Sequence, residues 1–368
     1  MIDNDRILAE KLVNYSCKVK EGENVLIEYS DCSEYFIKCI VQEVFKAKAH
    51  PFVKNVNRTL KKEILTSGDE ELFKLMESFD MEVMKKMDAV ILVCGEENVY
   101  EYKNIPSSQM KLYRKIYHDH TELRVSKKWV LLKYPTYGFA QSSGMSTDEF
   151  TEHFFKVCNL DYAKMGNAMD NLSKRMSSCD KVRIVAKDTD LTFSIKGIPN
   201  IKCCGECNIP DGELYTAPVK DSINGKITFN IPVTYSGVRH DNICLNFENG
   251  KIVNATSSNT EHLNEILDTD NGSRYMGEFS FGVNPYIENP ILDILFDEKM
   301  CYSIHMAVGC SYDDAYNGNK SAVHWDLIQS HKECYGGGEI YFDGELIRKN
   351  GLFIPSDLLA LNPENLIK

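Results

Sequence analysis

The first half of the chain alternates between short apolar runs and segments with a helical hydrophobic stripe. Strands are predicted at residues 24–29, 52–56, 89–93 and 129–133, and helices at residues 4–17, 33–48, 69–86 and 107–118. In the segment 33–48 the apolar side consists of Phe36, Ile37, Ile40, Val41, Val44 and Phe45, and Pro51 follows its end. Such strand–helix alternation predicts an α/β domain with a mainly parallel sheet.

The pattern of predicted secondary structure changes after Asp180. Before it, Ser146 and Glu149 form a capping-box pattern that predicts one helix running towards Arg175. After it come short strand-like runs at residues 181–186, 191–195, 226–233 and 243–253, with hairpin signals at residues 249–250 and 343–344. We therefore expect an N-terminal α/β domain at residues 1–180 and a β-rich α+β domain at residues 181–368.

The second half also carries ionisable residues inside apolar strand-like runs. Because strand side chains alternate between faces, His324 and Asp326 share one face of the run 322–328, and Trp325 takes the other. The same pattern occurs around Glu213, Glu278 and His305. All of these residues lie in the predicted β-rich domain.

Charged groups in such surroundings need a partner or a cation, because an unpaired buried charge is costly and neighbouring carboxylates repel one another. Mixed imidazole and carboxylate donors suit zinc, cobalt or manganese, whereas an all-oxygen set suits calcium or magnesium. The surplus of carboxylates suggests two ions that share a bridging ligand. Each short motif alone is also compatible with an exposed polar face or a simple ion pair.

Several motifs resemble one known family when they are taken in order. Residues 208–218 resemble the N-x-P-x-x-E-[VL]-[FY]-T-A-P signature of the aminopeptidase T and aminopeptidase S family of metallo-aminopeptidases. Further similar segments follow at residues 267–270, 276–278, 295–298, 305–312 and 323–326. The resemblance spans nearly the whole chain and implies a metal-dependent aminopeptidase acting on short peptides with a free N-terminus.

The resemblance also implies roles for individual residues. The implied metal ligands are Glu213, Glu278, His305, His324 and Asp326, with Glu278 as the bridge, and Glu298 either completes the second site or acts as general base. Tyr312 corresponds to the active-site tyrosine of the family. Two divalent ions, zinc or cobalt with manganese or magnesium as alternatives, and a homodimer are implied in the same way.

Composition narrows the remaining classes of function. A net charge of −12 argues against nucleic acid as a partner, since nucleic-acid binding requires a basic footprint. The longest apolar runs are too short to span a bilayer, and the acidic N-terminus does not resemble a signal peptide, so we expect a cytoplasmic protein without membrane contact. The 13 scattered cysteines suit a reducing compartment, and Cys203, Cys204 and Cys207 lack a fourth soft ligand at the spacing of a structural zinc site.

Two other classes of function stay open at this stage. One is a different binuclear metal-dependent hydrolase, an amidase or a phosphoesterase, although the motifs have few arginines nearby beyond Arg239 and Arg274. The other is a non-catalytic metal-binding or ion-pair scaffold. Metal content and metal-dependent peptide cleavage separate the three.

Overall fold

The computed structural model describes residues 3–368, which form two compact units. The first unit contains residues Met1–Leu160 and Gly205–Pro210, and the second contains Asp161–Cys204 and Asp211–Lys368. The domain division at residues 180 and 181 stays a prediction, because a compact unit is not by itself an independently folding domain. Within residues 3–368, no helix is long and apolar enough to cross a membrane.

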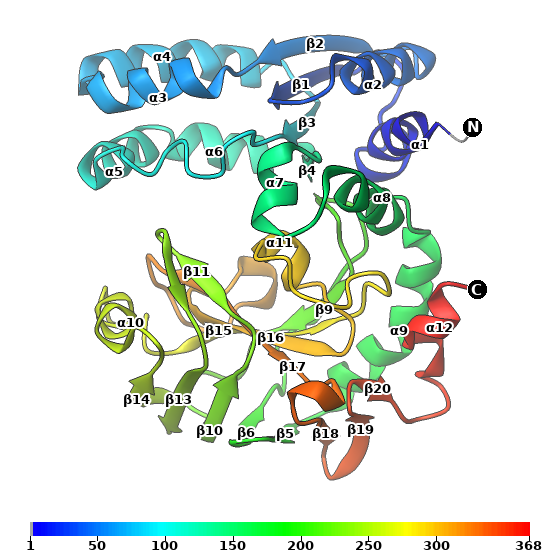
Figure 1. The fold of residues 1–368 in the computed structure, drawn as a ribbon, viewed down its shortest axis with the longest axis vertical. Helices are drawn as coiled ribbons and strands as arrows, with labels where there is room; N and C mark the ends of the chain where they lie inside the picture. Colours follow the sequence, from blue (N-terminus) through cyan, green and yellow to red (C-terminus); the bar gives the residue numbers. More distant parts are fainter. Residues whose placement is uncertain (1–2) are drawn as a thin grey trace. The chain divides into compact units, whose positions relative to one another are not determined.

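The first unit is built around a parallel sheet with the strand order β2-β1-β3-β4-β8 (Figure 1). Its strands are β1 (Asn24–Ser30), β2 (His50–Asn55), β3 (Ala89–Cys94), β4 (Lys128–Lys133) and β8 (Asn208–Ile209). Its helices are α1 (Asn4–Glu10), a π-helical turn (Lys11–Ser16), α2 (Glu34–Lys46), α3 (Arg58–Ser67), α4 (Glu70–Met84), α5 (Ser107–Ile116), α6 (His118–Val125), α7 (Tyr137–Ser142) and α8 (Thr147–Cys158). The predicted parallel α/β architecture is confirmed.

Two details of the helices differ from the expectation. Phe45 at the end of α2 is 62% exposed, because the helix places it beyond the buried stripe that includes Phe36, Ile40 and Val44. The prediction of a single helix from Ser146 towards Arg175 is wrong, because the segment contains two helices. The segment divides into α8 and α9 (Tyr162–Ser178), and the Asp161 side chain caps the new N-terminus by accepting from the Lys164 N–H.

The second unit contains two large antiparallel sheets and a small ribbon, β11-β12 (Figure 1). The eight-stranded sheet has the order β14-β13-β10-β6-β5-β18-β19-β20, and the five-stranded sheet has the order β17-β16-β15-β9-β7. The strands are β5 (Lys181–Ala186), β6 (Thr189–Ser194), β7 (Ile201–Cys203), β9 (Glu213–Thr216), β10 (Asn224–Phe229), β11 (Val233–Tyr235), β12 (Val238–His240), β13 (Ile243–Glu248), β14 (Lys251–Thr256), β15 (Met276–Gly282), β16 (Ser303–Gly309), β17 (His324–Ser330), β18 (Gly338–Phe342), β19 (Glu345–Lys349) and β20 (Leu352–Phe353).

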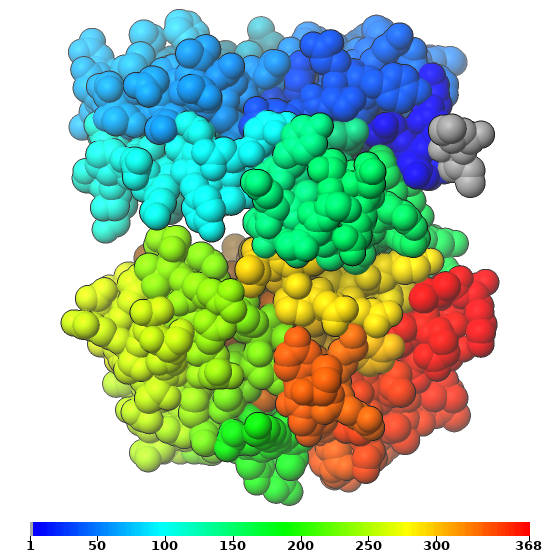
Figure 2. Space-filling model, in the orientation of Figure 1, coloured from blue at the N-terminus to red at the C-terminus, as the bar shows by residue number. Residues whose placement is uncertain are grey.

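The predicted hairpins are confirmed in this unit. Asn249 and Gly250 both have positive φ, and they connect β13 to β14, so the run 243–253 is two strands rather than one. The short helices of the unit are α10 (Thr260–Leu267), α11 (Ile294–Asp297) and α12 (Pro363–Leu366). The C-terminal segment, red in Figure 2, lies on the surface of the unit, where Lys164 of α9 donates to the carbonyls of Asn365 and Leu366.

Aromatic side chains between the two large sheets form the core of this unit. Phe279 of β15 packs edge-on against Phe193 of β6, with ring centroids 5.0 Å apart, and Phe281 packs against Phe342 of β18 at 6.0 Å. Full burial of a phenylalanine stabilises the fold by roughly 1.5–3 kcal/mol. The apolar face of β15 is therefore anchored to the eight-stranded sheet, and its polar residues project from the opposite face.

Candidate metal centre

All the strand residues predicted as metal ligands project from one face of the five-stranded sheet. Ala307 of β16 pairs with Glu278 of β15 on one side and with Asp326 of β17 on the other, so the three side chains form one row. His305 lies two residues along β16 from Ala307, and therefore on the same face. The methyl group of Ala307 leaves space between the two carboxylates.

A first group of donors consists of Glu213, Glu278 and His305, all of them buried. The His305 Nε2 atom lies 3.0 Å from Glu278 Oε1 and 3.2 Å from Glu213 Oε2. The other ring nitrogen, Nδ1, donates to the Glu298 carbonyl at 3.0 Å. This second hydrogen bond orients the imidazole so that Nε2 points at the two carboxylates.

A second group consists of Glu278, His324 and Asp326. The His324 Nε2 atom lies 3.5 Å from both Glu278 Oε2 and Asp326 Oδ1, while Nδ1 donates to the Cys310 carbonyl at 2.8 Å. Gly309 pairs with His324 and has φ +97°, and a Cβ at Gly309 would lie 2.1 Å from the Val323 carbonyl oxygen. A glycine at this position therefore allows β16 and β17 to approach closely.

These residues fit divalent metal. The His324 Nε2 atom is buried and has no hydrogen-bond partner. Buried polar atoms almost always have a partner, so an orphaned nitrogen beside two carboxylates indicates a cation. Donors that bind one ion at 2.0–2.2 Å in tetrahedral geometry lie roughly 3.3–3.6 Å apart. The two His324 separations of 3.5 Å lie in this range, and the two His305 separations of 3.0 and 3.2 Å lie just below it. Glu278 belongs to both groups.

The electrostatics of these residues agree with this reading. Burial raises the pKa of Glu278, and the neighbouring charges of Glu213 and Asp326 raise it further. Burial disfavours the charge of His305, but its hydrogen bonds to Glu213 and Glu278 raise its pKa well above the usual value. Without a metal the site thus holds protons that a divalent cation would replace.

Glu298 lies beside the two groups and belongs to neither. Its Oε1 atom lies 2.6 Å from the Lys299 ammonium, and burial raises its pKa to about 8. Lys299 is not among the site residues predicted from the sequence. The side chain is only 1% exposed and also contacts Glu213 Oε1 at 2.5 Å, although a Glu-Lys pair in a sequence usually indicates a solvated surface.

Tyr312 lies at the edge of this site. Its ring packs over His324 with centroids 4.6 Å apart and meets the Tyr215 ring at 5.6 Å, and the residue is 48% exposed. The Tyr215 hydroxyl donates to Asp314 Oδ1 at 2.8 Å. Two phenol rings and a carboxylate thus line the border between the buried donors and solvent.

The cysteine cluster is arranged differently from a thiolate zinc site. Cys203 lies with Asp211 and Glu213, whereas the metal-like groups found among residues 3–368 include neither Cys204 nor Cys207. No disulfide joins cysteines among residues 3–368.

Fold and site together define a metalloenzyme in which a β-rich unit displays imidazole and carboxylate donors from one sheet. The chain belongs to the thermophilic metalloprotease (M29) family, whose model matches residues 4–353. It is therefore a metal-dependent hydrolase of peptide bonds that uses divalent metal, and the family resemblance seen in the sequence is confirmed.

Individual relatives agree with this assignment. The chain is 25% identical over 362 residues to "Aminopeptidase AmpS" of Bacillus subtilis (strain 168), covering 87% of each chain. The solved structure of wild-type AmpT from Thermus thermophilus superposes with a TM-score of 0.81 at 19% identity, over 96% of this chain and 99% of that one. A 2,5-dihydroxypyridine dioxygenase from Pseudomonas putida KT2440 has a TM-score of 0.61 at 13% identity, over 97% and 100%. Because a dioxygenase has a similar fold, the fold alone does not decide the reaction.

Proposed function

We propose that this protein is a binuclear aminopeptidase that removes N-terminal residues from short peptides. The observation that carries the proposal is the pair of three-donor groups sharing Glu278. In two-metal hydrolases a shared carboxylate holds two ions at the short separation at which both can act on one substrate. Membership of the metalloprotease family and the relative named AmpS support the peptide substrate.

We assign one ion to Glu213, Glu278 and His305, and the other to Glu278, His324 and Asp326. These donors are nitrogen and oxygen atoms without a thiolate, so zinc or cobalt suits them best, with manganese or magnesium as alternatives. The protein also orients the imidazole ligands. The Glu298 and Cys310 carbonyls fix the tautomers of His305 and His324.

In the proposed mechanism the bound ions supply Lewis acidity and lower the pKa of the attacking water. Glu298 accepts the proton of this water, because burial raises its pKa towards the working range of a general base. The Tyr312 hydroxyl donates a hydrogen bond to the oxyanion that develops on the scissile carbonyl. Glu298 then returns the proton to the leaving amine.

An exopeptidase also has to bind the free amine of its substrate. We assign this task to the carboxylates at the edge of the site, with Asp314 as the candidate because Tyr215 holds it beside Tyr312. The net charge of −12 favours the approach of a cationic N-terminus. A homodimer, which rests on the family resemblance, and a cytoplasmic location, which rests on the sequence composition, remain proposals.

The test combines metal analysis with peptide hydrolysis. Purified protein is assayed for metal content and for cleavage of aminoacyl chromogenic substrates and short peptides, before chelation, after chelation, and after zinc or cobalt is restored. About two ions per chain with metal-dependent release of N-terminal residues would support the proposal. Cleavage of N-acetylated peptides as fast as free ones would refute the aminopeptidase assignment.

The alternatives make different predictions in the same assay. A phosphoesterase requires cations for the phosphate, yet Arg274 pairs with Asp268 at 2.6 Å and Arg239 pairs with Asp241 at 2.9 Å. Metal-dependent cleavage of amides or phosphate esters without peptide cleavage would favour another hydrolase. Absence of bound metal under every loading condition would favour an ion-pair scaffold.

A further inference from the structure

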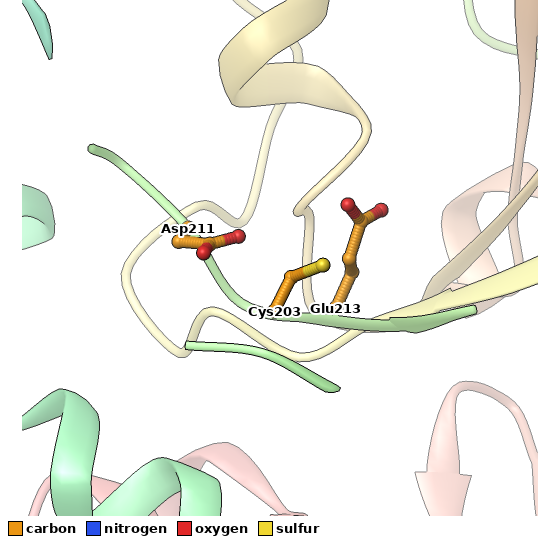
Figure 3. A group of neighbouring side chains, drawn as sticks. All are labelled: Cys203, Asp211 and Glu213. Carbon is orange, nitrogen blue, oxygen red and sulfur yellow. The ribbon is translucent and has the colours of Figure 1, made fainter. Parts of the chain in front are cut away.

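A third group of metal-like donors lies beside the proposed centre. Cys203 of β7 pairs in register with Glu213 of β9, and their side chains project from the same side of the sheet (Figure 3). Asp211 precedes β9 and brings its carboxylate to the same place. The thiol and the two carboxylates offer donor atoms within 4.8 Å of one another. By residue type alone this group would suit a thiophilic divalent ion such as zinc or cadmium.

A side-chain cation already lies against this group. The Lys299 ammonium is 2.5 Å from Glu213 Oε1 and 3.9 Å from Asp211 Oδ1, and the same ammonium is 2.6 Å from Glu298 Oε1. The side chain of Lys299 is 1% exposed. A metal bound to Glu213 Oε1 at about 2.0–2.2 Å would need the lone pairs and the space that the ammonium uses.

We propose that the Lys299 ammonium takes the place that a metal ion would have beside Cys203, Asp211 and Glu213, so that this group is an ammonium site. Lys299 thereby gives different roles to the carboxylates around it. Lys299 occupies Glu213 Oε1, so Glu213 offers Oε2, which also accepts a hydrogen bond from the Ser280 hydroxyl, to the ion shared with His305. Lys299 also pairs with Glu298, which belongs to neither donor group of the proposed centre, and so keeps its carboxylate available as a base. Lys299 is thus a positioning residue, and this inference rests on the proposed function.

Replacing the ammonium with an isosteric apolar group tests the proposal. In Lys299→Met the Cys203, Asp211 and Glu213 donors lose their cation, and Glu298 is free to move. We expect cadmium titration of the metal-free variant to produce a thiolate-to-cadmium charge-transfer absorption that the wild-type protein lacks. The double variant Lys299→Met with Cys203→Ser should lose this band. Lys349→Met is the control, because Lys349 forms a surface pair with Glu339 and is half exposed.

Kinetics provide a second readout. We expect kcat of zinc-loaded Lys299→Met to fall about 100-fold, the lower end of the contribution of a positioned general base, while KM changes by less than about threefold. A purely structural role for Lys299 would lower the fraction of folded enzyme without separating kcat from KM per active site. Equal kcat for Lys299→Met and wild type would overturn the proposal.

The wild-type protein gives an answer even where Lys299→Met fails to fold. Cadmium-loaded wild type without a thiolate band that depends on Cys203 supports the ammonium site. A band that Cys203→Ser removes would show that a metal binds Cys203 beside Lys299, and would overturn the proposal of an ammonium site. Metal content and peptide cleavage of the wild-type protein separate these results from failure of the proposed function, since in that case the wild type would bind no metal or would not release N-terminal residues.

Discussion

Glu278 is the residue whose loss should affect both proposed ions. Its Oε1 atom lies 3.0 Å from His305 Nε2 and its Oε2 atom lies 3.5 Å from His324 Nε2, so one side chain serves both donor groups. The substitution Glu278→Gln keeps the size and one oxygen of the side chain but removes its charge. We expect this variant to lose both ions.

The expected loss of metal affinity follows from the number of ligands that each ion keeps. Each ion would keep two of its three assigned protein ligands. Loss of an outer-shell partner alone weakens metal binding by about 10–100-fold. Loss of a ligand should therefore lower the affinity for each ion by at least about 100-fold. This corresponds to about 2.7 kcal/mol for each ion. Peptide hydrolysis should fall in parallel.

Metal competition with a chromophoric chelator measures these affinities directly, and elemental analysis after dialysis gives the number of ions bound per chain. Glu213→Gln and Asp326→Asn each belong to one group only, so they should reduce the count from about two ions to about one. Glu339→Gln, which alters a surface pair with Lys349, should leave both ions in place. Retention of two ions at wild-type affinity in Glu278→Gln would refute the shared-ligand reasoning.

Three further predictions follow from the same site. Tyr312→Phe keeps the ring contact with His324 but removes the hydroxyl, so kcat should fall by about 10²–10³-fold with metal content intact, and full activity would reduce Tyr312 to a packing residue. Burial lowers the pKa of His324, but the nearby carboxylates of Asp326 and Glu278 and the Cys310 carbonyl together raise it to about 10. Metal must displace this proton, so metal affinity should rise with pH up to about pH 10 with proton release, and calorimetry in two buffers that shows no release would contradict this. Gly309→Ala introduces a Cβ 2.1 Å from the Val323 carbonyl oxygen, so we expect a lower melting temperature and weaker binding of the ion near His324; unchanged values would show that β17 can shift freely.

Some features of this protein were determined by local sequence. The alternation of strand side chains placed His324 and Asp326 on one face, and the structure agrees, because this period of two is a property of each strand alone. The change from strand–helix alternation to hairpins was also readable, since the turn at Asn249 and Gly250 requires positive φ at both positions.

Other features were decided only by the tertiary structure. The pairing of Ala307 with both Glu278 and Asp326 depends on the register of three strands, which is set by hydrogen bonds between distant segments and by packing on the second sheet. The short strand β8 joins the parallel sheet of the first unit across a long stretch of chain, and nothing in its few residues indicates this. Lys299 beside Glu298 has the local pattern of a solvated pair, because burial is a property of the whole fold and not of neighbouring residues.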